Sequence, residues 1–448
     1  MPISAAQNSV KSYDIYILFA KDLRMCKKSS TFAPEMYLYV LLLHIAALFN
    51  EKAKLLVKGQ AETLRRLRDM GETLHGCIWF HAASVGEFEQ ARPIIERLRR
   101  EQPGRKILVT FFSPSGYEMR KDYAQADMVC YLPLATRRNA KRFLEFVQPA
   151  MAVFVKYEFW PAYLKELRKR EIPTYIIAAL FRPNQPFFRW YGGLYRRLLR
   201  CFTTLFVQDE RSRALLEKYG ITNAVVAGDT RFDRVAQILR DKREIPQIMR
   251  FTEPEMTSLQ LNPEPPKVIV AGSTWPEDER LLARYIQERP GVKLVLTPHE
   301  IDDAHLHFIF NLFQGRFVRF TEATLMNVNT NNVLLIDRMG MLSLLYRFGQ
   351  VAYVGGGFGA GIHNTIEAAV YGVPVVFGPR YHKFREAEEL IEAGGGFSVH
   401  DYESFAAAMD EAFAHHDEYG RRAGDYVQSQ LGATDKIYRS LLECSIIT

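Results

Sequence analysis

Residues 351–379 read VAYVGGGFGAGIHNTIEAAVYGVPVVFGP, and this stretch decides the fold of the chain. The apolar runs Val351–Val354 and Val373–Phe377 predict two buried parallel strands. Between them lie a glycine-rich loop and a short helix, predicted over Thr365–Tyr371 and ended by Gly372. A strand, a glycine loop and a helix in this order are typical of a doubly wound α/β domain that binds a ligand at its strand ends.

The same loop carries side chains suited to a nucleotide. Glycines lack Cβ atoms, so backbone N–H groups can approach an anion, and the positive end of the following helix favours the same charge. His363, Asn364 and Glu367 lie in or just after the loop. Asn364 and Glu367 fall on one face of the helix, where an amide and a carboxylate suit a ribose diol and its phosphate. The alternative is an ordinary Rossmann-type turn whose glycines serve only close packing.

Composition narrows the class of protein. A chain of 448 residues with 48% hydrophobic and 24% charged residues predicts two to three globular domains. A net charge of +7 favours anionic partners such as phosphorylated substrates or acidic lipid. Nucleic acid is disfavoured, because no recognition-helix, zinc-finger or RNP-like pattern occurs. Five cysteines without metal spacing indicate a reducing compartment, and no Asp-X-Asp motif follows an apolar strand, so no metal is predicted.

The N-terminal residues differ from the rest of the chain. Residues 1–35 show no periodicity, and we expect them to be an extension outside the core. Met36–Phe49 is nearly all apolar but is shorter than the ~20 residues that span a bilayer, and lysines follow at once. Residues 36–59 therefore predict a helix lying in the headgroup region of an anionic membrane surface, with a buried core helix as the equal alternative. No signal-peptide order is present, which favours the cytoplasm.

Two series of alternating strands and helices follow, one from Gly76 and one from about Val268. Apolar runs predict strands at Cys77–Phe80, Lys106–Phe111, Met128–Tyr131, Met151–Val155, Thr174–Ala178, Thr204–Val207, Val268–Ala271, Lys293–Thr297 and Val333–Ile336, besides the two quoted above. The predicted fold is two doubly wound Rossmann-like α/β domains facing across a cleft. We expect an N-terminal domain at 60–239, a connector at 240–266 and a C-terminal domain at 267–448.

In the first domain, two carboxylates lie just after predicted strands, and one arginine lies in a motif that closes the domain. Glu87 begins a helix after the turn His81-Ala-Ala-Ser-Val-Gly, where an apolar wall can raise its pKa toward general-base duty. A capping box between Ser84 and Glu87 is the alternative, and both can hold. Glu158 lies among aromatic residues and needs a partner, either Lys156 or a cation across the cleft, unless it is an ordinary surface residue. Arg231, in Gly228-Asp-Thr-Arg-Phe-Asp, is expected near the cleft.

Other turns offer binding groups. Ser273 and Thr274 follow a strand and precede a helix, where hydroxyl and backbone donors meet a phosphate, and Gly340 allows close approach of a base or ribose. The segment from Phe181 to Tyr191 interleaves aromatic residues with arginines. That pattern suits an amphiphile that bears phosphates, and the alternative is an ordinary solvated basic helix face.

Several of these motifs, in this order, make the chain resemble bacterial 3-deoxy-D-manno-octulosonic acid (Kdo) transferases of lipid A synthesis, over about Met36–Gln430. The resemblance rests on His81–Glu87, Glu158–Pro161, Gly228–Asp233, Gly272–Thr274, Gly340–Leu342 and Gly361–Glu367. It implies a B-type glycosyltransferase fold and transfer of Kdo from CMP-Kdo to the lipid A precursor bisphosphate (lipid IVA). It also implies work at the cytoplasmic face of the inner membrane. From the residues alone we expect neither a metal nor a cofactor.

The resemblance further implies residue roles. Glu87 would deprotonate the acceptor hydroxyl, and Glu158 and Arg231 would support the transition state. The implied contacts to the donor are Ser273, Thr274, Pro298, His299, Gly340, Met341, Leu342, Gly361, His363, Asn364, Thr365, Ile366 and Glu367.

Two departures from the family pattern stand out. Members commonly have Lys where this chain has Arg231, and Pro-Arg-His-Pro where it has Pro298-His299-Glu300, which leaves the role of His299 open. One rival interpretation is a B-type transferase or epimerase that uses a UDP-sugar. Another is a non-catalytic two-domain sugar-binding protein.

Overall fold

The computed structural model describes residues 45–253 and 266–446. The chain divides into two compact units. Unit 1 comprises residues 1–234 and 432–448, and unit 2 comprises residues 235–431. The predicted extension at 1–35 lies outside the described residues, as do residues 36–44 of the predicted membrane-surface helix.

Unit 1 is built on a parallel sheet of seven strands in the order β3-β2-β1-β4-β5-β6-β7. The strands are β1 Ile78–Ala82, β2 Ile107–Phe111, β3 Met128–Tyr131, β4 Met151–Val155, β5 Thr174–Ala179, β6 Thr204–Val207 and β7 Ala224–Val226. Strands β1 and β4 pair directly, with Ile78 opposite Met151. The strand order reverses between these two strands, and ligands of such sheets bind at the carboxyl ends beside that reversal.

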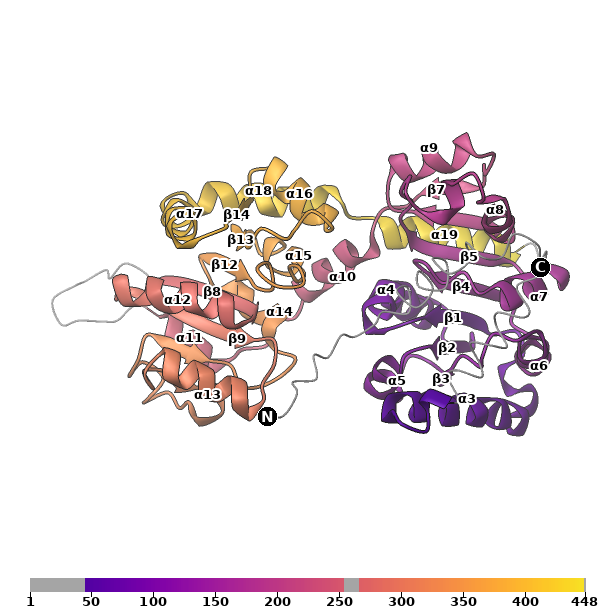
Figure 1. The fold of residues 1–448 in the computed structure, drawn as a ribbon, viewed down its shortest axis with the longest axis horizontal. Coiled ribbons are helices and arrows are strands. Elements are labelled where there is room, and N and C mark those ends of the chain that lie inside the picture. The colour runs from indigo at the N-terminus through magenta and orange to yellow at the C-terminus, as the bar shows by residue number, and fades with distance from the viewer. Residues whose placement is uncertain (1–44, 254–265, 447–448) are drawn as a thin grey trace. The chain divides into compact units, whose positions relative to one another are not determined.

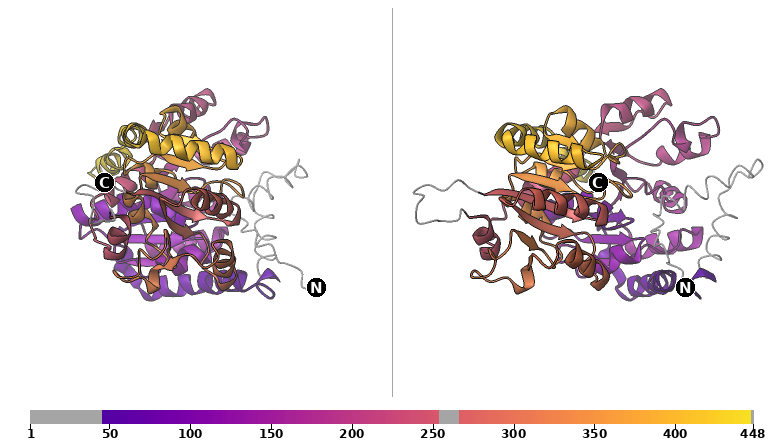
Figure 2. Two further views of the ribbon diagram at one scale, coloured as in Figure 1. Left: turned by 90° about the vertical axis from the view of Figure 1, so that its left-hand side faces the viewer. Right: turned by 60° about the vertical axis from the view of Figure 1, so that its left-hand side comes forward.

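Helices cover both faces of this sheet (Figures 1 and 2). They are α3 Glu51–Asp69, α4 Val85–Glu101, α5 Pro114–Arg120, α6 Arg137–Val147, α7 Pro161–Lys169, α8 Gly193–Leu199, α9 Glu210–Lys218 and α19 Ala433–Ile446. Helix α10, Thr230–Ile238, follows β7 and contains the boundary with unit 2. Helix α6 illustrates why they form: Ala140, Phe143, Leu144 and Val147 are buried at helical spacing, and the Thr136 hydroxyl caps the first turn.

Unit 2 repeats the pattern with seven parallel strands in the order β10-β11-β9-β8-β12-β13-β14. The strands are β8 Lys267–Thr274, β9 Val292–Pro298, β10 Val318–Arg319, β11 Val333–Leu335, β12 Val351–Val354, β13 Val375–Phe377 and β14 Gly396–Ser398. The helices are α11 Pro246–Thr252, α12 Pro276–Glu288, α13 Asp303–Leu312, α14 Leu342–Leu345, α15 Ile366–Ala369, α16 Arg385–Glu392, α17 Tyr402–Ala414 and α18 His416–Ser429. Here the order reverses between β8 and β12. The prediction of two doubly wound α/β domains is confirmed.

The domain boundaries differ from those predicted. Helix α19, expected in the C-terminal domain at 267–448, belongs to unit 1. Its residues Ile437, Tyr438 and Leu441 are buried in the same apolar cluster as helix α4, and Asp435 binds Arg97 of α4 at 2.7 Å. Figure 1 shows α19 in yellow beside the earlier elements of unit 1. Packing against α4, rather than position in the sequence, decides where this helix belongs.

The predicted connector at 240–266 is also replaced by a different arrangement. The chain passes from unit 1 to unit 2 between Arg234 and Val235, inside α10. Helix α11 then packs within unit 2, where Ile248 and Phe251 are fully buried and the Phe251 carbonyl accepts a hydrogen bond from Lys293 at 3.0 Å. The described part of the expected connector therefore contains a helix that packs into the core of unit 2 through Ile248 and Phe251.

The predicted helix at 36–59 is interrupted in its described part. Residues 47–49 form a turn, Asn50 caps a new helix by accepting a hydrogen bond from Ala53 N, and α3 continues to Asp69. Leu56 of α3 is buried, whereas Leu48 and Phe49 are 76% and 87% exposed. No helix in the described ranges combines the length and apolar character needed to cross a membrane.

Candidate functional site

Glu87 lies at the carboxyl end of β1, beside the strand reversal of unit 1. Ser84 is the N-cap of α4 and Glu87 its third residue, half-buried. The Ser84 hydroxyl donates a hydrogen bond to Oε2 of Glu87. It accepts no hydrogen bond from a backbone N–H group of α4, so the capping box considered above does not form. Ser84 therefore orients the Glu87 carboxylate instead of closing the helix end.

Glu158 follows β4, the strand next to β1, and is 8% exposed, so it is not an ordinary surface residue. Its Oε2 accepts a hydrogen bond from Trp160 Nε1 at 2.7 Å and lies 3.2 Å from His81 Nε2. His81 is fully buried at the end of β1. The sequence correctly predicted that Glu158 needs a partner. The contacts of its carboxylate within unit 1 are with His81 and Trp160.

Arg231 is held by the buried carboxylate of Asp229, a residue for which no role was predicted from the sequence. Asp229 is 7% exposed, and its Oδ2 accepts from Nε and Nη2 of Arg231 at 2.8 and 2.7 Å. Burial alone would raise the pKa of Asp229, but the charge and hydrogen bonds of Arg231, with the charge of Lys156, hold that pKa below its usual value. The guanidinium is thereby oriented and kept beside a permanent negative charge.

The Asp229–Arg231 turn is fastened to helix α4. Gln90 of α4 donates to Asp229 Oδ1 at 3.2 Å, and the Thr230 hydroxyl donates to the Gln90 carbonyl at 2.6 Å. Since Gln90 lies one helical turn after Glu87, the same helix positions both the Glu87 carboxylate and the turn that carries Arg231. Unit 1 thus brings Glu87, Glu158 and Arg231 to the carboxyl edge of its sheet.

In unit 2 the last two residues of β8 are Ser273, which is strained, and Thr274, whose hydroxyl group is already hydrogen-bonded. Ser273 has a φ of 54°, unusual for a residue with a side chain, at an irregularity in the pairing of β8 with β9. Thr274 is fully buried, and its hydroxyl donates to Glu279 Oε1 at 2.9 Å. Its single hydrogen is therefore unavailable to a phosphate, contrary to the expectation. The Ser273 hydroxyl has no hydrogen-bond partner among the residues described, and of the pair it is the candidate donor.

Three rings form a column beside the glycine loop. The ring of His299, after β9, lies 4.9 Å from that of Trp275 and 4.4 Å from that of His363, both nearly parallel. Burial lowers the pKa of His299, and burial together with the charge of His299 lowers the pKa of His363 to about 4. His363 is therefore neutral near pH 7, and its Nε2 accepts a hydrogen bond from Trp275 at 3.4 Å.

Beyond the loop, Asn364 is bonded to Glu367, and two polar atoms have no hydrogen-bond partner among the described residues. Asn364 Nδ2 donates to Glu367 Oε1 at 2.9 Å, which joins the two side chains predicted for a ribose. Asn364 Oδ1 and Thr365 Oγ1 are buried without a hydrogen-bond partner among the described residues. An unsatisfied buried polar atom costs about 1–3 kcal/mol, which a ligand with matching groups offsets. The helix expected over Thr365–Tyr371 shortens to α15, so its dipole contributes less than predicted.

Two of the glycines are required by close packing, and two others are required by their backbone conformation. A Cβ on Gly357 would lie 2.5 Å from Gly378 Cα, and one on Gly355 would collide with the Ser273 carbonyl. These two glycines therefore serve close packing, as the Rossmann-turn alternative holds. Gly361 and Gly340, with φ of 135° and 82°, need glycine for their backbone conformation.

The remaining predicted donor contacts lie at the same edge of the sheet. Pro298 ends β9 and is buried, as is Ile366 at the start of α15. Met341 and Leu342 follow Gly340, and Leu342 approaches β8 so closely that a Cβ on Gly272 would lie 2.5 Å from its Cδ1. The loops after β8, β9, β11 and β12 thus meet beside the strand reversal of unit 2.

Two acids in the first turn of α12, Asp278 and Glu279, are fully buried. Asp278 accepts hydrogen bonds from Gly356 N and Trp275 N, both at 2.9 Å, and from Tyr353 at 2.6 Å. Burial raises the pKa of Asp278. Its neighbour Glu279 binds His305 at 2.9 Å. Asp278 thus ties the glycine loop to α12, and Glu279 ties α12 to α13. No group of potential metal ligands gathers within 45–253 and 266–446.

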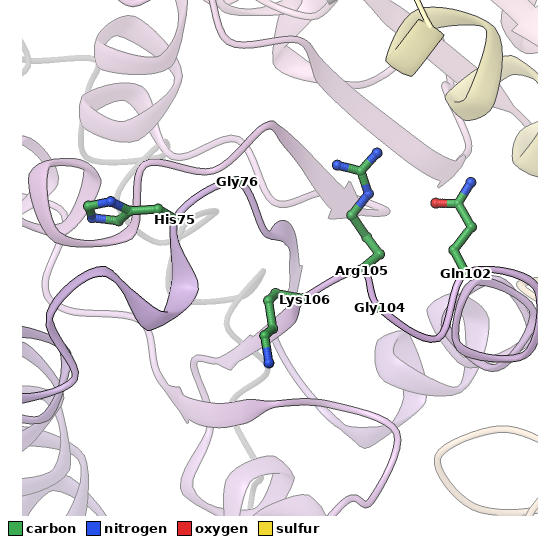
Figure 3. A pocket seen from close by; sticks show the side chains of 6 residues that line it. All are labelled: His75, Gly76, Gln102, Gly104, Arg105 and Lys106. Atoms are coloured by element: carbon green, nitrogen blue, oxygen red, sulfur yellow. The ribbon is translucent and has the colours of Figure 1, made fainter.

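A surface hollow lies at the opposite edge of the sheet of unit 1. It is lined by His75, Gly76, Gln102, Gly104, Arg105 and Lys106. Figure 3 shows its longer side chains pointing in different directions, and Lys106 binds Asp127 at 3.3 Å. Because it borders the amino ends of β1 and β2, it is not where this kind of sheet binds ligands.

Known proteins resemble the chain in sequence and in fold. A family model described as 3-deoxy-D-manno-octulosonic-acid transferase (kdotransferase) matches residues 55–234. The 3-deoxy-D-manno-octulosonic acid transferase of Aquifex aeolicus (strain VF5) is 27% identical over 363 residues, which cover 79% of this chain and 91% of that protein. The protein of the same name from Haemophilus influenzae (strain ATCC 51907 / DSM 11121 / KW20 / Rd) is 27% identical over 361 residues, covering 78% and 81%.

Solved structures add a similarity of fold alone. A UDP-GlcNAc 2-epimerase from Neisseria meningitidis bound to UDP-GlcNAc has a TM-score of 0.57 at 17% identity, covering 83% of this chain and 100% of that one.

Proposed function

Since the chain belongs to the 3-deoxy-D-manno-octulosonic acid (Kdo) transferase family, we propose that it transfers Kdo from CMP-Kdo to the lipid A precursor lipid IVA in lipopolysaccharide biosynthesis. One structural observation carries this proposal: Glu87, Glu158 and Arg231 lie at the carboxyl edge of the sheet of unit 1, beside the strand reversal. Two carboxylates in different surroundings together with an oriented cation suit glycosyl transfer to a hydroxyl group.

In the proposed reaction Glu87 removes the proton of the acceptor hydroxyl. The hydroxyl oxygen forms a bond to the anomeric carbon of Kdo, while the bond from that carbon to the phosphate oxygen breaks and CMP leaves with the electron pair. Arg231, held in place by Asp229, supplies positive charge to a substrate phosphate. A departing phosphate needs positive potential rather than an acid, so we propose a reaction that uses neither metal nor cofactor.

We place the donor nucleotide on unit 2. Glu367, joined to Asn364, offers a carboxylate to the ribose hydroxyls, and the orphaned Asn364 Oδ1 and Thr365 Oγ1 add an acceptor and a hydroxyl. The Ser273 hydroxyl is the candidate to donate a hydrogen bond to the phosphate of CMP-Kdo. The strained backbone that carries it supports this placement, because strain of this kind gathers at binding sites. The ring column of Trp275, His299 and His363 borders the site without a formal charge on His363.

Mass spectrometry of the product tests the function directly. The purified chain, given CMP-Kdo and tetraacylated lipid IVA, is expected to yield a product heavier by one or more Kdo residues and to release CMP. UDP-GlcNAc in place of CMP-Kdo is expected to give neither transfer nor epimerisation. Turnover of UDP-GlcNAc would favour the rival UDP-sugar enzyme, and binding of CMP-Kdo without turnover would favour the sugar-binding protein.

We further propose that the protein associates with the cytoplasmic face of the inner membrane through unit 1. Leu48 and Phe49 are exposed just before α3, and Trp190 and Tyr191, beside Arg189, are 88% and 50% exposed just before α8. Helices α3 and α8 contribute to the same apolar cluster, on one face of the sheet. Exposed apolar and aromatic side chains beside cations match the headgroup region of an anionic leaflet.

The double variant Leu48→Glu/Phe49→Glu is expected to bind anionic vesicles at least about tenfold more weakly, because each apolar side chain contributes about 1.5–3 kcal/mol on leaving water and 1.4 kcal/mol is a factor of ten. Co-sedimentation with phosphatidylglycerol-containing vesicles measures this. Met326→Glu in unit 2, at a residue 92% exposed, is the matched control and should bind like the wild type. Equal binding of the double variant and the wild type would rule out this contact.

A further inference from the structure

A closed network of hydrogen bonds joins the end of β8 to the loop after β9 in unit 2. Oε1 of Glu279, in α12, accepts from the Thr274 hydroxyl at 2.9 Å, and Oε2 lies 2.9 Å from Nε2 of His305, in α13. Nδ1 of His305 lies 3.0 Å from the Glu300 carbonyl oxygen. The backbone closes the network, because His299 N donates to the Thr274 carbonyl at 3.0 Å. Neither Glu279 nor His305 has a role in the proposed reaction.

Both ring nitrogens of His305 face oxygen atoms that accept hydrogen bonds. A backbone carbonyl has no hydrogen to give, so Nδ1 carries a proton and donates it to the Glu300 carbonyl. Nε2 faces a carboxylate oxygen of Glu279, and a lone pair of Nε2 at that distance would be repulsive. A proton therefore lies between the two side chains, and it belongs to the imidazole, which is a stronger base than a carboxylate. The Thr274 hydroxyl stabilises the ionised carboxylate from its other side.

The surroundings of His305 favour its charged form. Its side chain and that of Glu279 are buried. The hydrogen bond to Glu279 and the charge of that residue raise the pKa of His305 although burial opposes them, and the nearby Asp302, which caps α13, acts in the same direction. Burial lowers the pKa of His299, so this neighbouring ring adds no positive charge near pH 7. Glu279 and His305 are thus a buried ion pair at neutral pH.

We infer that Glu279 and His305 are positioning residues for the phosphate end of the proposed nucleotide site. Ser273, the candidate to donate to the phosphate, directly precedes Thr274 in β8. His299, a member of the ring column beside the glycine loop, is itself part of the network. The ion pair therefore fixes the spacing between the ends of β8 and β9, and with it the places of the Ser273 hydroxyl and the His299 ring.

This role concerns the phosphate and rests on the proposed function. The side chains proposed for the ribose, Asn364 and Glu367, lie after β12, in a different loop. Loss of the network should therefore weaken the binding of CMP and leave the binding of cytidine, which has no phosphate, nearly unchanged. The ion pair itself does not depend on that function.

The ion pair can be measured without any ligand. In the full chain labelled with ¹⁵N-histidine, both ring nitrogens of His305 should be protonated at pH 7, with the signals assigned by their loss in His305→Gln. In Glu279→Gln the side-chain amide can donate to Nε2 and its oxygen can accept from Thr274. His305 should then be neutral, with its proton on Nδ1. This change is specific to an ion pair, because the variant keeps the shape and the hydrogen bonds of the network.

Nucleotide binding supplies the second readout, through calorimetry with CMP and a titration with cytidine. Glu279→Leu keeps a side chain of similar bulk but breaks the network. It should weaken CMP binding by about tenfold to a hundredfold, the size of effect seen when a supporting partner of a functional group is removed. Its cytidine binding should stay close to that of the wild type. Glu279→Gln, which retains the hydrogen bonds, should bind CMP nearly as the wild type does.

Glu277→Leu is the matched control. Glu277 lies in the same first turn of α12, and its side chain is 59% exposed. The variant should change neither CMP binding nor the His305 signals. If Glu279→Leu fails to fold, Thr274→Val takes its place, because it removes only one hydroxyl from the network. Thr274→Val should weaken CMP binding by about threefold to tenfold, the size of one hydrogen bond.

Each outcome separates the claims. An unprotonated ring nitrogen of His305 in the wild type at pH 7 overturns the ion pair. Wild-type CMP binding by Glu279→Leu, or by Thr274→Val in its place, overturns the positioning role, and so does an equal loss of cytidine binding. A wild-type protein that binds no CMP contradicts the proposed function instead, and the His305 signals still decide whether the ion pair exists.

Discussion

Glu87→Gln is expected to lower the rate of Kdo transfer by about 10²–10⁴-fold, the usual contribution of a general base, and to leave CMP binding unchanged. The amide keeps the size of the side chain but cannot accept the acceptor's proton. Calorimetry with CMP and a transfer assay with CMP-Kdo measure the two quantities separately. Glu87 belongs to unit 1 and the proposed nucleotide contacts belong to unit 2, so the rate of transfer should change and CMP binding should not.

Glu101→Gln is the control for this prediction. Glu101 ends the same helix, α4, and pairs with Arg97 on the surface at 2.9 Å. It should retain wild-type transfer. Ser84→Ala should lower transfer less than Glu87→Gln does, because it removes only the hydroxyl that orients the carboxylate. Near-normal transfer by Glu87→Gln would exclude Glu87 as the base.

Arg231→Met is expected to abolish measurable transfer and to destabilise the protein by about 3 kcal/mol, the lower end of the cost of breaking a buried ion pair. The lower end applies because the Arg231 side chain is 26% exposed, while that of Asp229 is 7% exposed. Without the guanidinium the Asp229 carboxylate keeps Gln90 and a backbone N–H group but loses its main charged partner. Urea denaturation at neutral pH measures the loss.

The pH dependence of this loss has a definite sign. In the wild type the pKa of Asp229 is lower in the folded state, so the stability it contributes is present above its unfolded value of 3.8 and is lost as pH falls through the folded value. In Arg231→Met burial raises the folded pKa instead. The deficit of the variant should therefore be largest near neutral pH and shrink on acidification toward about pH 4.

The double variant Asp229→Asn/Arg231→Met separates stability from activity. The Asn oxygen can still accept from Gln90 and from the backbone N–H of residue 231, and no buried charge remains. The double variant should be more stable than Arg231→Met at neutral pH but equally inactive. If the double variant is as unstable as the single one, a buried uncompensated charge is not the cause.

Much of the fold could be predicted because buried strands of parallel sheets are continuous apolar runs. The bounds of β3, β4, β6 and β12 agree with the prediction. The strands that were missed are short and lie at the sides of the sheets: β7, β10 and β14. Their two or three residues carry no periodicity, and Val225 in β7 is 44% exposed. Pairing with a neighbour, and not their own pattern, makes them strands.

The candidate site was predictable only where a residue lies in a turn directly after a strand. Glu158 meets that condition, and Glu87 begins the helix after another such turn, whereas Arg231 follows β7, one of the strands that were missed. The structure brings all three to one edge of one sheet. The hydrogen-bond partners of these residues could not be predicted in the same way. His81 lies in a recognised turn, but its contact with Glu158 joins residues 77 positions apart, and Gln90 reaches Asp229 across 139 positions. Contacts across such separations depend on strand order, which local sequence patterns do not encode.

The return of α19 to unit 1 bears on how the protein is made. On the ribosome, unit 1 emerges first but lacks the helix whose Ile437, Tyr438 and Leu441 cover an apolar surface shared with α4. At ordinary translation rates the wait for that helix lasts on the order of tens of seconds, during which all of unit 2 is synthesised. A nascent chain with such a bare surface is a natural client for chaperones, and truncation after Leu431 would make that exposure permanent.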